Sequence, residues 1–154
     1  MSNLAALLDV EGHYAEAEKL DRERLEIERR VLGPEHPDTL LSMGNLAIAQ
    51  AHEGHYGEAE KSAQETLDIR RRVLAPEDPD TADTTYTLGC IAALRGRRDE
   101  ALSLLREAVD HGLRPADDLG IDKDSDLRSL HGDPRFEALI AHAKERASAA
   151  QKPN

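Results

Sequence analysis

The chain repeats itself with a period of 42 residues, and this repetition limits its fold more than any other feature. Aligning residues 1–39 on residues 43–81 gives 24 identities in 39 positions. A third, decayed copy between residues 85 and 112 keeps framework residues such as Leu88, Gly96 and Ala101. Such periods are typical of proteins that stack copies of one short supersecondary unit. We therefore expect an array of units rather than a core built from distant segments.

Each copy is predicted to be a pair of helices. Proline is tolerated in the first turn of a helix, so Pro37 and Pro79 mark helix starts. Gly54 and Gly96 are typical of the left-handed residue that follows a helix. The spacing predicts first helices over 37–53 and 79–95. Second helices are expected to begin near Tyr14, Tyr56 and Arg98.

The residues before the two prolines differ as helix caps. Asp78 is a natural N-cap for the helix that begins at Pro79, because its carboxylate can accept a hydrogen bond from a free backbone N–H. His36 stands in the equivalent place before Pro37 and is expected to be a poorer cap.

Composition supports helices and excludes several classes of protein. Aromatic residues make up 3% of the 154 residues, Trp is absent, and the net charge is −11, which disfavours a nucleic-acid partner because phosphate binding needs clustered cations. No apolar run approaches the roughly 18 residues of a membrane span, and no basic segment precedes an apolar one at the N-terminus. We therefore expect no membrane association and a cytoplasmic location. A single cysteine, Cys90, excludes an intramolecular disulfide.

Leucine and small residues at fixed spacing resemble the tetratricopeptide repeat. The first helices carry Leu followed by a small residue, and the second helices carry Ala thirteen positions after that Leu. The pairs are Leu4-Ala5, Leu46-Ala47 and Leu88-Gly89, and the alanines are Ala17, Ala59 and Ala101. The 42-residue period and the join over Val31–Thr39 resemble the kinesin-light-chain variety. The resemblance implies an all-α fold: a right-handed α-solenoid of about three helix-turn-helix repeats with a C-terminal capping helix.

The expected organisation follows from these copies and from the tail. Residues 1–112 form the repeats, divided as 1–36, 37–78 and 79–112, and residues 113–132 form a connecting segment with a short helix. A capping helix is predicted over 133–150, with Asp133 as N-cap and Pro134 in its first turn, followed by a frayed tail over 151–154. The apolar stripe of the capping helix, expected to pack on the third repeat, consists of Phe136, Leu139, Ile140 and Ala143.

A search for catalytic or metal-binding motifs predicts no enzyme, no cofactor and no metal. His52 and His55 have metal-ligand spacing, but no third ligand accompanies them in sequence, so solvated polar residues at a helix end are the favoured reading. Glu16, Glu18, Glu58 and Glu60 recur in register and complement the dipole of the second helices rather than forming an acid–base pair. Cys90 lacks an activating partner in sequence and is expected to be a small filler or a groove residue.

The resemblance implies that the first helices line a concave groove that holds a protein or peptide partner. In similar arrays an Asn directly before the Leu contacts the peptide backbone; here the matching residues are Asn3 and Asn45, whereas the third copy departs with Thr87. Neighbours on the same helical face are Leu41, Ile48 and His52, then Asp83, Tyr86, Cys90 and Leu94. The alternative for each is an ordinary exposed residue or, for Leu41, Ile48 and Leu94, core packing.

A structural role is the second hypothesis. By analogy with residues 37–53, the first helix of repeat one lacks about two turns, which leaves Leu4, Leu7 and Leu8 under-covered. The chain is then either a piece of a longer array or a self-assembly element that forms a homo-oligomer through this N-terminal end.

Overall fold

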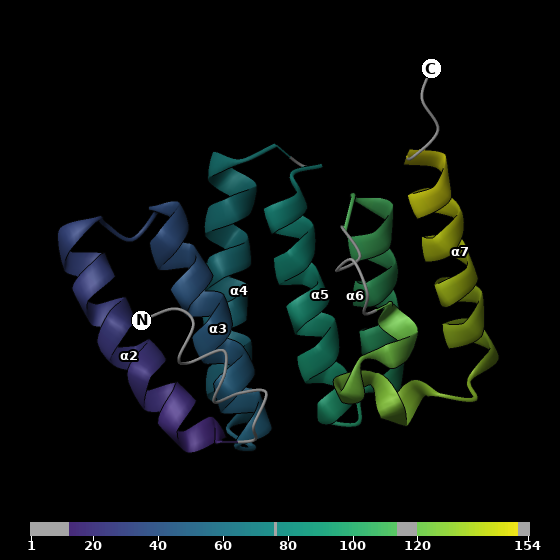
Figure 1. The fold of residues 1–154 in the computed structure, drawn as a ribbon, viewed down its shortest axis with the longest axis horizontal. Helices are drawn as coiled ribbons and strands as arrows, with labels where there is room; N and C mark the ends of the chain where they lie inside the picture. The colour runs from purple at the N-terminus through teal and green to yellow at the C-terminus, as the bar shows by residue number, and fades with distance from the viewer. Residues whose placement is uncertain (1–12, 76, 114–119, 151–154) are drawn as a thin grey trace. The chain divides into compact units, whose positions relative to one another are not determined.

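The computed structural model describes residues 13–75, 77–113 and 120–150. The chain divides into two compact units, residues 1–74 and residues 75–154, which are described separately below. Helices are the regular elements of the described residues, and no strand occurs among them (Figure 1). Along this part of the chain, no helix has the length and apolar character needed to cross a bilayer.

The first unit is built around a central helix. Its helices are α2 (Tyr14–Val31), α3 (Pro37–His52) and α4 (Tyr56–Val73), and α3 packs against both α2 and α4. The predicted starts at Tyr14, Pro37 and Tyr56 are confirmed, and α3 ends one residue before the expected Glu53.

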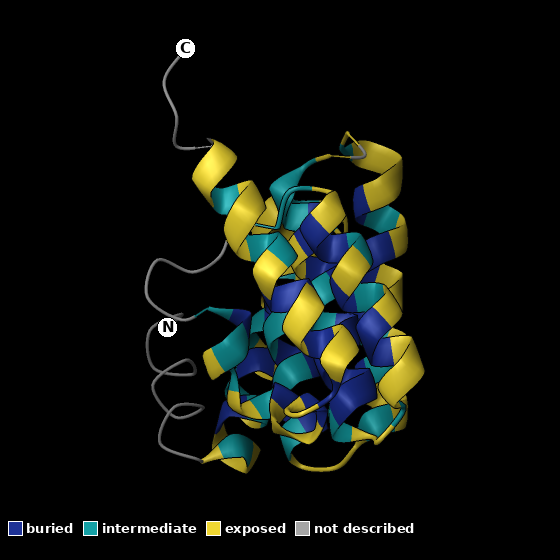
Figure 2. Ribbon diagram, turned by 90° about the vertical axis from the view of Figure 1, so that its right-hand side faces the viewer, coloured by how far each residue is buried: buried dark blue, intermediate teal, exposed yellow. Residues whose placement is uncertain are grey.

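Small side chains bring these helices close together. Ala17, Ala47, Ala59 and Ala63 are all completely buried, so the backbones can approach without larger side chains between them. An apolar cluster lies beside this contact; it contains Leu25, Leu40, Met43 and Leu46, with the half-buried Ile69 packed against it. Buried and exposed positions alternate around the helices, as Figure 2 shows.

The caps of the two first helices are more alike than their sequences suggest. The Oδ1 atom of Asp78 accepts a hydrogen bond from the backbone N–H of Asp80 at 2.9 Å. His36 caps in the same way, because its Nδ1 atom accepts from the N–H of Asp38 at 3.2 Å. The sequence predicted a poorer cap at His36 because histidine is not among the preferred cap residues. The structure nevertheless shows a cap there, since the extended backbone at His36 places an imidazole nitrogen where a carboxylate oxygen lies at Asp78.

The second unit combines a helix pair with a C-terminal segment. It contains α5 (Pro79–Leu94), α6 (Arg98–Asp110), the 3₁₀ turns η1 (Ile121–Lys123) and η2 (Ser125–Leu130), and α7 (Pro134–Ala150). α6 packs against α5 and α7, and η2 packs against α5. The turn between α5 and α6 contains Gly96 at φ 79°, the left-handed conformation predicted from its place in the repeat.

The predicted stripe of α7 packs on the third repeat. Phe136 is completely buried, and Leu139 and Ile140 join it in one core with Leu105 and Val109 of α6. The half-buried Ala143 packs against the same core.

The N-cap of α7 lies where the sequence predicted it. The Oδ1 atom of Asp133 accepts from the backbone N–H of Arg135 at 2.9 Å, and Oδ2 pairs with the Arg135 guanidinium at 2.8 Å. These hydrogen bonds from Arg135 lower the pKa of Asp133 to about 2, so the cap stays ionised in all but strong acid.

Helix α5 lies close to α6 at Gly89. A Cβ atom at this position would lie 2.9 Å from the Cγ and Cδ2 atoms of Leu105. The equivalent positions of the second repeat carry Ala47 and Ala63, both completely buried. The third repeat therefore has Gly on its first helix and Leu on its second, where the second repeat has Ala on both. The smaller residue on one helix makes room for the larger residue on the other.

We predict that Gly89→Val lowers the free energy of unfolding by about 2 kcal/mol, because the added atoms overlap Leu105 in a packed core. Urea unfolding monitored by circular dichroism measures this change. Gly44→Ala in α3 is the matched control: its Cβ would meet no atom within 4 Å, so the better helix propensity of Ala should stabilise the protein by roughly 0.5–1 kcal/mol. Equal effects of the two substitutions would contradict the close contact at Gly89.

Candidate functional site

One accessible stripe runs along α3. After the first turn, most residues of this helix are buried, and the residues that retain exposure are Leu41, Gly44, Asn45, Ile48 and His52. Positions 41, 45, 48 and 52 fall on one side of a helix, because their spacing returns to the same direction every three or four residues. We call Leu41, Asn45, Ile48 and His52 the α3 stripe; they are the residues predicted from the sequence for the second repeat.

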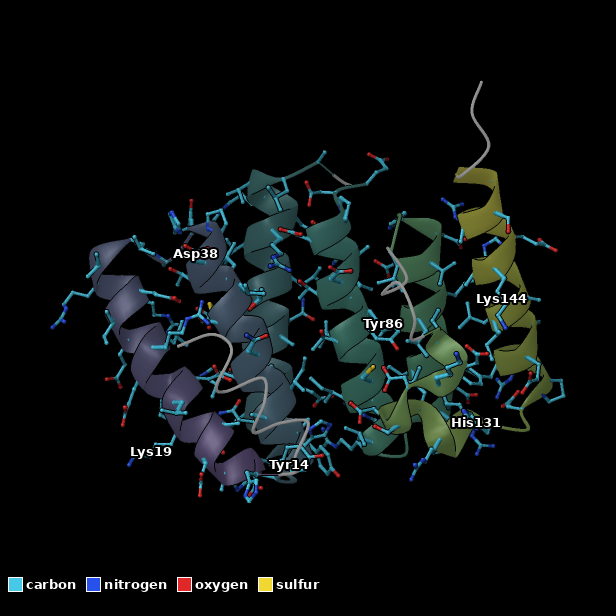
Figure 3. The ribbon with its side chains drawn as sticks, viewed as in Figure 1. Tyr14, Lys19, Asp38, Tyr86, His131 and Lys144 are labelled. Carbon is cyan, nitrogen blue, oxygen red and sulfur yellow. The ribbon has the colours of Figure 1, made fainter. Side chains whose placement is uncertain are left out.

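The members of the α3 stripe differ in exposure. The side chain of Leu41 is 48% exposed, whereas Asn45 and Ile48 are half-buried. His52 ends the stripe, and its ring lies 4.3 Å from the ring of Tyr14 at the start of α2 (Tyr14 is labelled in Figure 3). The stripe thus offers a leucine, a carboxamide and an isoleucine, with His52 held by an aromatic contact.

His52 and His55 have separate surroundings. The Nδ1 atom of His55 lies 3.4 Å from the Glu18 carboxylate on α2, which also pairs with Arg22 at 2.6 Å. Burial raises the pKa of Glu18, but hydrogen bonds from Arg22 and His55 outweigh this effect and lower it. His55 therefore belongs to a polar contact between α2 and the start of α4.

The equivalent stripe on α5 is accessible at Asp83, Thr87 and Leu94. Asp83 is exposed, Thr87 and Leu94 are half-buried, and the Thr87 hydroxyl donates to the carbonyl of Asp83 at 3.0 Å. The Thr87 hydroxyl therefore donates within its own helix. Thr87 also lacks the carboxamide that Asn45 carries at the equivalent position of α3.

Tyr86 and Cys90, the other two residues predicted for this face, contact the C-terminal segment. The Tyr86 hydroxyl donates to Oδ2 of Asp124 at 2.5 Å, and the Cys90 thiol lies 3.9 Å from the same oxygen (Tyr86 is labelled in Figure 3). Asp124 is the N-cap of η2, because its Oδ1 accepts from the backbone N–H of Asp126 at 2.9 Å. One carboxylate therefore caps the 3₁₀ turn and fixes it to α5.

Burial and charge keep both α5 side chains protonated. Desolvation, with Cys90 and Asp124 close by, raises the pKa of Tyr86 far above its usual range. Desolvation, with the charges of Asp124 and Asp126, also raises the pKa of the Cys90 thiol well above its ordinary value. A buried, protonated thiol is a poor nucleophile, so this arrangement does not favour nucleophilic catalysis.

Cys90, Asp124 and Asp126 also bring metal-ligand atoms together. Their donor atoms lie within 4.8 Å of one another. His52 and His55, the pair with metal-ligand spacing in the sequence, are not part of this group. Metal binding would require the thiolate of Cys90 and the oxygen that accepts from Tyr86. The donor set therefore fits a hydrogen-bonded contact better than a metal centre.

The sequence did not identify the role of Asp124. Its position before Ser125 and Asp126 is a cap signal for a short turn, but a contact with α5 across more than thirty residues leaves no periodic signal. Asn3, Leu4, Leu7 and Leu8, predicted for the groove and for self-association, lie outside the residues that the structure describes.

Helix pairs with small buried contacts and one accessible stripe on each described first helix define a class of helical repeat protein. A family model described as Tetratricopeptide repeat matches residues 1–72 and again residues 50–111. The chain therefore belongs to the tetratricopeptide repeat family, as its motifs indicated. Proteins of this family generally mediate protein interactions and are generally non-catalytic.

Two solved structures have the same fold. One is the crystal structure of Podosopora anserina kinesin light chain nearly identical TPR-like repeats, which is 22% identical, with a TM-score of 0.72, and covers 99% of this chain and 75% of that chain. A point variant of the same protein gives 22% identity and a TM-score of 0.71, with 98% and 74% covered. The predicted all-α repeat fold is confirmed by these comparisons. No curated protein matches the sequence.

We predict that Cys90 reacts slowly with a thiol reagent such as DTNB in the folded protein, at least tenfold more slowly than in urea, because the thiol is buried and protonated. Asp124→Ala should accelerate the reaction by removing both a covering residue and a negative charge. Glu137→Ala, which removes an exposed carboxylate from α7, is the control and should leave the rate unchanged. Since Cys90 is the sole cysteine, each rate reports on this contact alone, and equal rates in native and urea-treated protein would contradict it.

Proposed function

We propose that this protein is a non-enzymatic binding module that holds an extended segment of another protein on the α3 stripe. The observation that carries the proposal is that α3 is buried on its other sides after the first turn, yet stays accessible along Leu41, Asn45, Ile48 and His52. Family membership supports a protein partner rather than a small molecule.

The chemistry of the stripe suits an extended peptide. The Asn45 carboxamide can donate to a backbone carbonyl and accept from a backbone N–H, so it can bind a peptide whatever its side chains. Leu41 and Ile48, one turn to either side, supply apolar contacts for alternate side chains of the partner. Binding would then combine a sequence-independent hydrogen bond with two apolar contacts that select the partner.

The α5 stripe of the second unit is proposed as a contact surface of its own, formed by Asp83, Thr87 and Leu94. Tyr86 and Cys90 already contact Asp124; Cys90 is buried, whereas Tyr86 is half-buried like Thr87 and Leu94. We therefore assign both residues a part in fixing η2, and we propose contact with a partner for Asp83, Thr87 and Leu94. Asn3, the residue equivalent to Asn45 in the first repeat, remains proposed on its sequence alone.

Self-association through the N-terminal repeat is a second candidate, favoured by a difference between two equivalent isoleucines. Ile69 of α4 packs against the cluster of Leu25, Leu40, Met43 and Leu46, whereas Ile27, its counterpart on α2, is 46% exposed. A second copy of the chain could cover Ile27, while Leu4, Leu7 and Leu8 remain proposed for self-association on their sequence alone.

Peptide selection tests the first candidate. We predict that peptides selected from a random display library on the wild-type protein lose roughly tenfold in affinity on Asn45→Ala, the size expected for lost hydrogen bonds to a backbone. Ile48→Asp should weaken the same peptides further. Gln64→Ala on α4 is the control, since Gln64 is exposed and lies outside the stripe. Failure to select peptides, or equal binding by wild type and Asn45→Ala, would refute the proposal.

Light scattering over a wide concentration range tests the second candidate. Self-association predicts a mass above 17.0 kDa for the wild type and a return to 17.0 kDa for Ile27→Glu. Val73→Glu at the end of α4, where the side chain is 43% exposed, is the control and should assemble as the wild type does. A wild-type mass of 17.0 kDa at every concentration would rule self-association out.

A further inference from the structure

A cleft of about 370 Å³ lies on the first unit between α2 and α4, with part of α3 as its floor. Leu25 of α2 and Leu46 and Gln50 of α3 line its buried part. Residues 46 and 50 point away from the α3 stripe, because each residue advances about 100° around a helix. The cleft is therefore separate from the proposed peptide-binding face.

Gln50 is a buried polar residue with one unsatisfied atom. Its side chain is 2% exposed, and its Nε2 atom donates to Oε2 of Glu58 at 3.1 Å. Its Oε1 atom has no hydrogen-bond partner among the described residues, which is costly for a buried acceptor. The repeat does not require a polar residue here, since the sequence carries Leu8 and Ala92 at the equivalent positions.

The charges around the cleft balance. Arg22 and Arg29 on α2 pair across it with Glu58 and Glu65 on α4, at 3.6 and 3.5 Å. Glu26 and Lys61 complete a lining of three basic and three acidic residues. The lining has no net charge, so it selects neither an anion nor a cation, and its adjacent opposite charges suit a neutral, dipolar occupant.

The Lys61 ammonium group is available as a donor. Lys61 is exposed, and it forms no ion pair or hydrogen bond with any other residue in the described ranges. The cleft thus brings Lys61 Nζ, a donor, and Gln50, whose unsatisfied Oε1 atom is buried beneath its surface, beside the apolar side chains of Leu25 and Leu46.

We propose that this cleft binds the primary carboxamide of an Asn or Gln side chain presented by a partner polypeptide. The Gln50 side chain turns toward the cleft so that the amide N–H donates to its Oε1 atom, the amide carbonyl accepts from Lys61, and the methylene groups lie against Leu25 and Leu46. A carboxamide alone among the neutral side-chain groups presents both a strong N–H donor and a strong carbonyl acceptor in one plane. Binding here does not depend on the α3 stripe, so Asn45→Ala should leave it unchanged.

Titration with N-acetyl-glutamine methylamide, followed by NMR of the ¹⁵N-labelled protein, tests the proposal. We expect saturable shifts of the Gln50 side-chain NH₂ and of the backbone amides around Lys61. The analogue N-acetyl-norvaline methylamide, which lacks the carboxamide, should bind at least fivefold more weakly. The analogue N-acetyl-glutamate methylamide should also bind more weakly, because its carboxylate has no N–H group to donate to Gln50 Oε1.

Two variants separate binding at the cleft from binding elsewhere. Gln50→Leu removes the acceptor and introduces the residue type of the first repeat, and Ser62→Phe fills the cleft from α4 while Gln50 itself is kept. Both should abolish the saturable shifts, whereas Gln64→Leu, whose amide donates to Asp68 outside the cleft, should bind as the wild type does. The proposal is overturned if the glutamine probe causes no saturable shift, if all three probes bind equally, or if Ser62→Phe binds like the wild type.

Discussion

The packing of α3 between α2 and α4 is the interaction on which the first unit depends. It is possible because alanine stands at the closest contacts, where Ala17, Ala47, Ala59 and Ala63 are completely buried. Helices separated by small side chains lie close enough for the larger residues beside them, such as Met43 and Leu46, to meet in one cluster. The third repeat reaches the same end by another route, with Gly89 against Leu105. The repeat therefore preserves the close approach of its helices more strictly than the identity of the residues that permit it.

This packing also leaves accessible the face on which we propose that a partner binds. A helix enclosed on most sides holds the backbone of its accessible residues in place, which lowers the entropy lost on binding. The α3 stripe has this property, and so does the floor of the cleft beside Gln50. In the second unit, Asp124 covers Tyr86 and Cys90, so the C-terminal segment narrows the accessible part of α5. The difference in accessible residues between α3 and α5 thus comes from the C-terminal segment that packs on α5.

The sequence predicts the helices well, because the signals that start and end them are local. Pro37, Pro79 and Gly96 act through their own backbone conformation, and the same type of residue recurs at the equivalent position of another repeat. The stripe of α7 was predictable for the same reason, since a helical period of apolar residues needs no knowledge of the partner. Contacts between distant segments were less predictable. The pairing of Tyr86 with Asp124 spans 38 residues, and the burial of Gln50 follows from its place between two other helices. His36 shows that a helix cap depends on backbone geometry as well as on residue type. Its backbone is extended, and its Nδ1 atom accepts the hydrogen bond that a carboxylate oxygen accepts at Asp78.

The central claim is that α3 uses its buried sides for stability and its stripe for binding. The free energy of unfolding of Leu41→Ser/Asn45→Ala, set beside that of Ala47→Leu, tests this claim most directly. The account predicts that the stripe variant unfolds within about 1 kcal/mol of the wild type, because its residues contribute little to packing. Ala47→Leu should lose about 2–3 kcal/mol, because it forces bulk into a completely buried contact between helices. A stripe variant as unstable as Ala47→Leu would show that the stripe belongs to the core, and would contradict the assignment of this face to a partner.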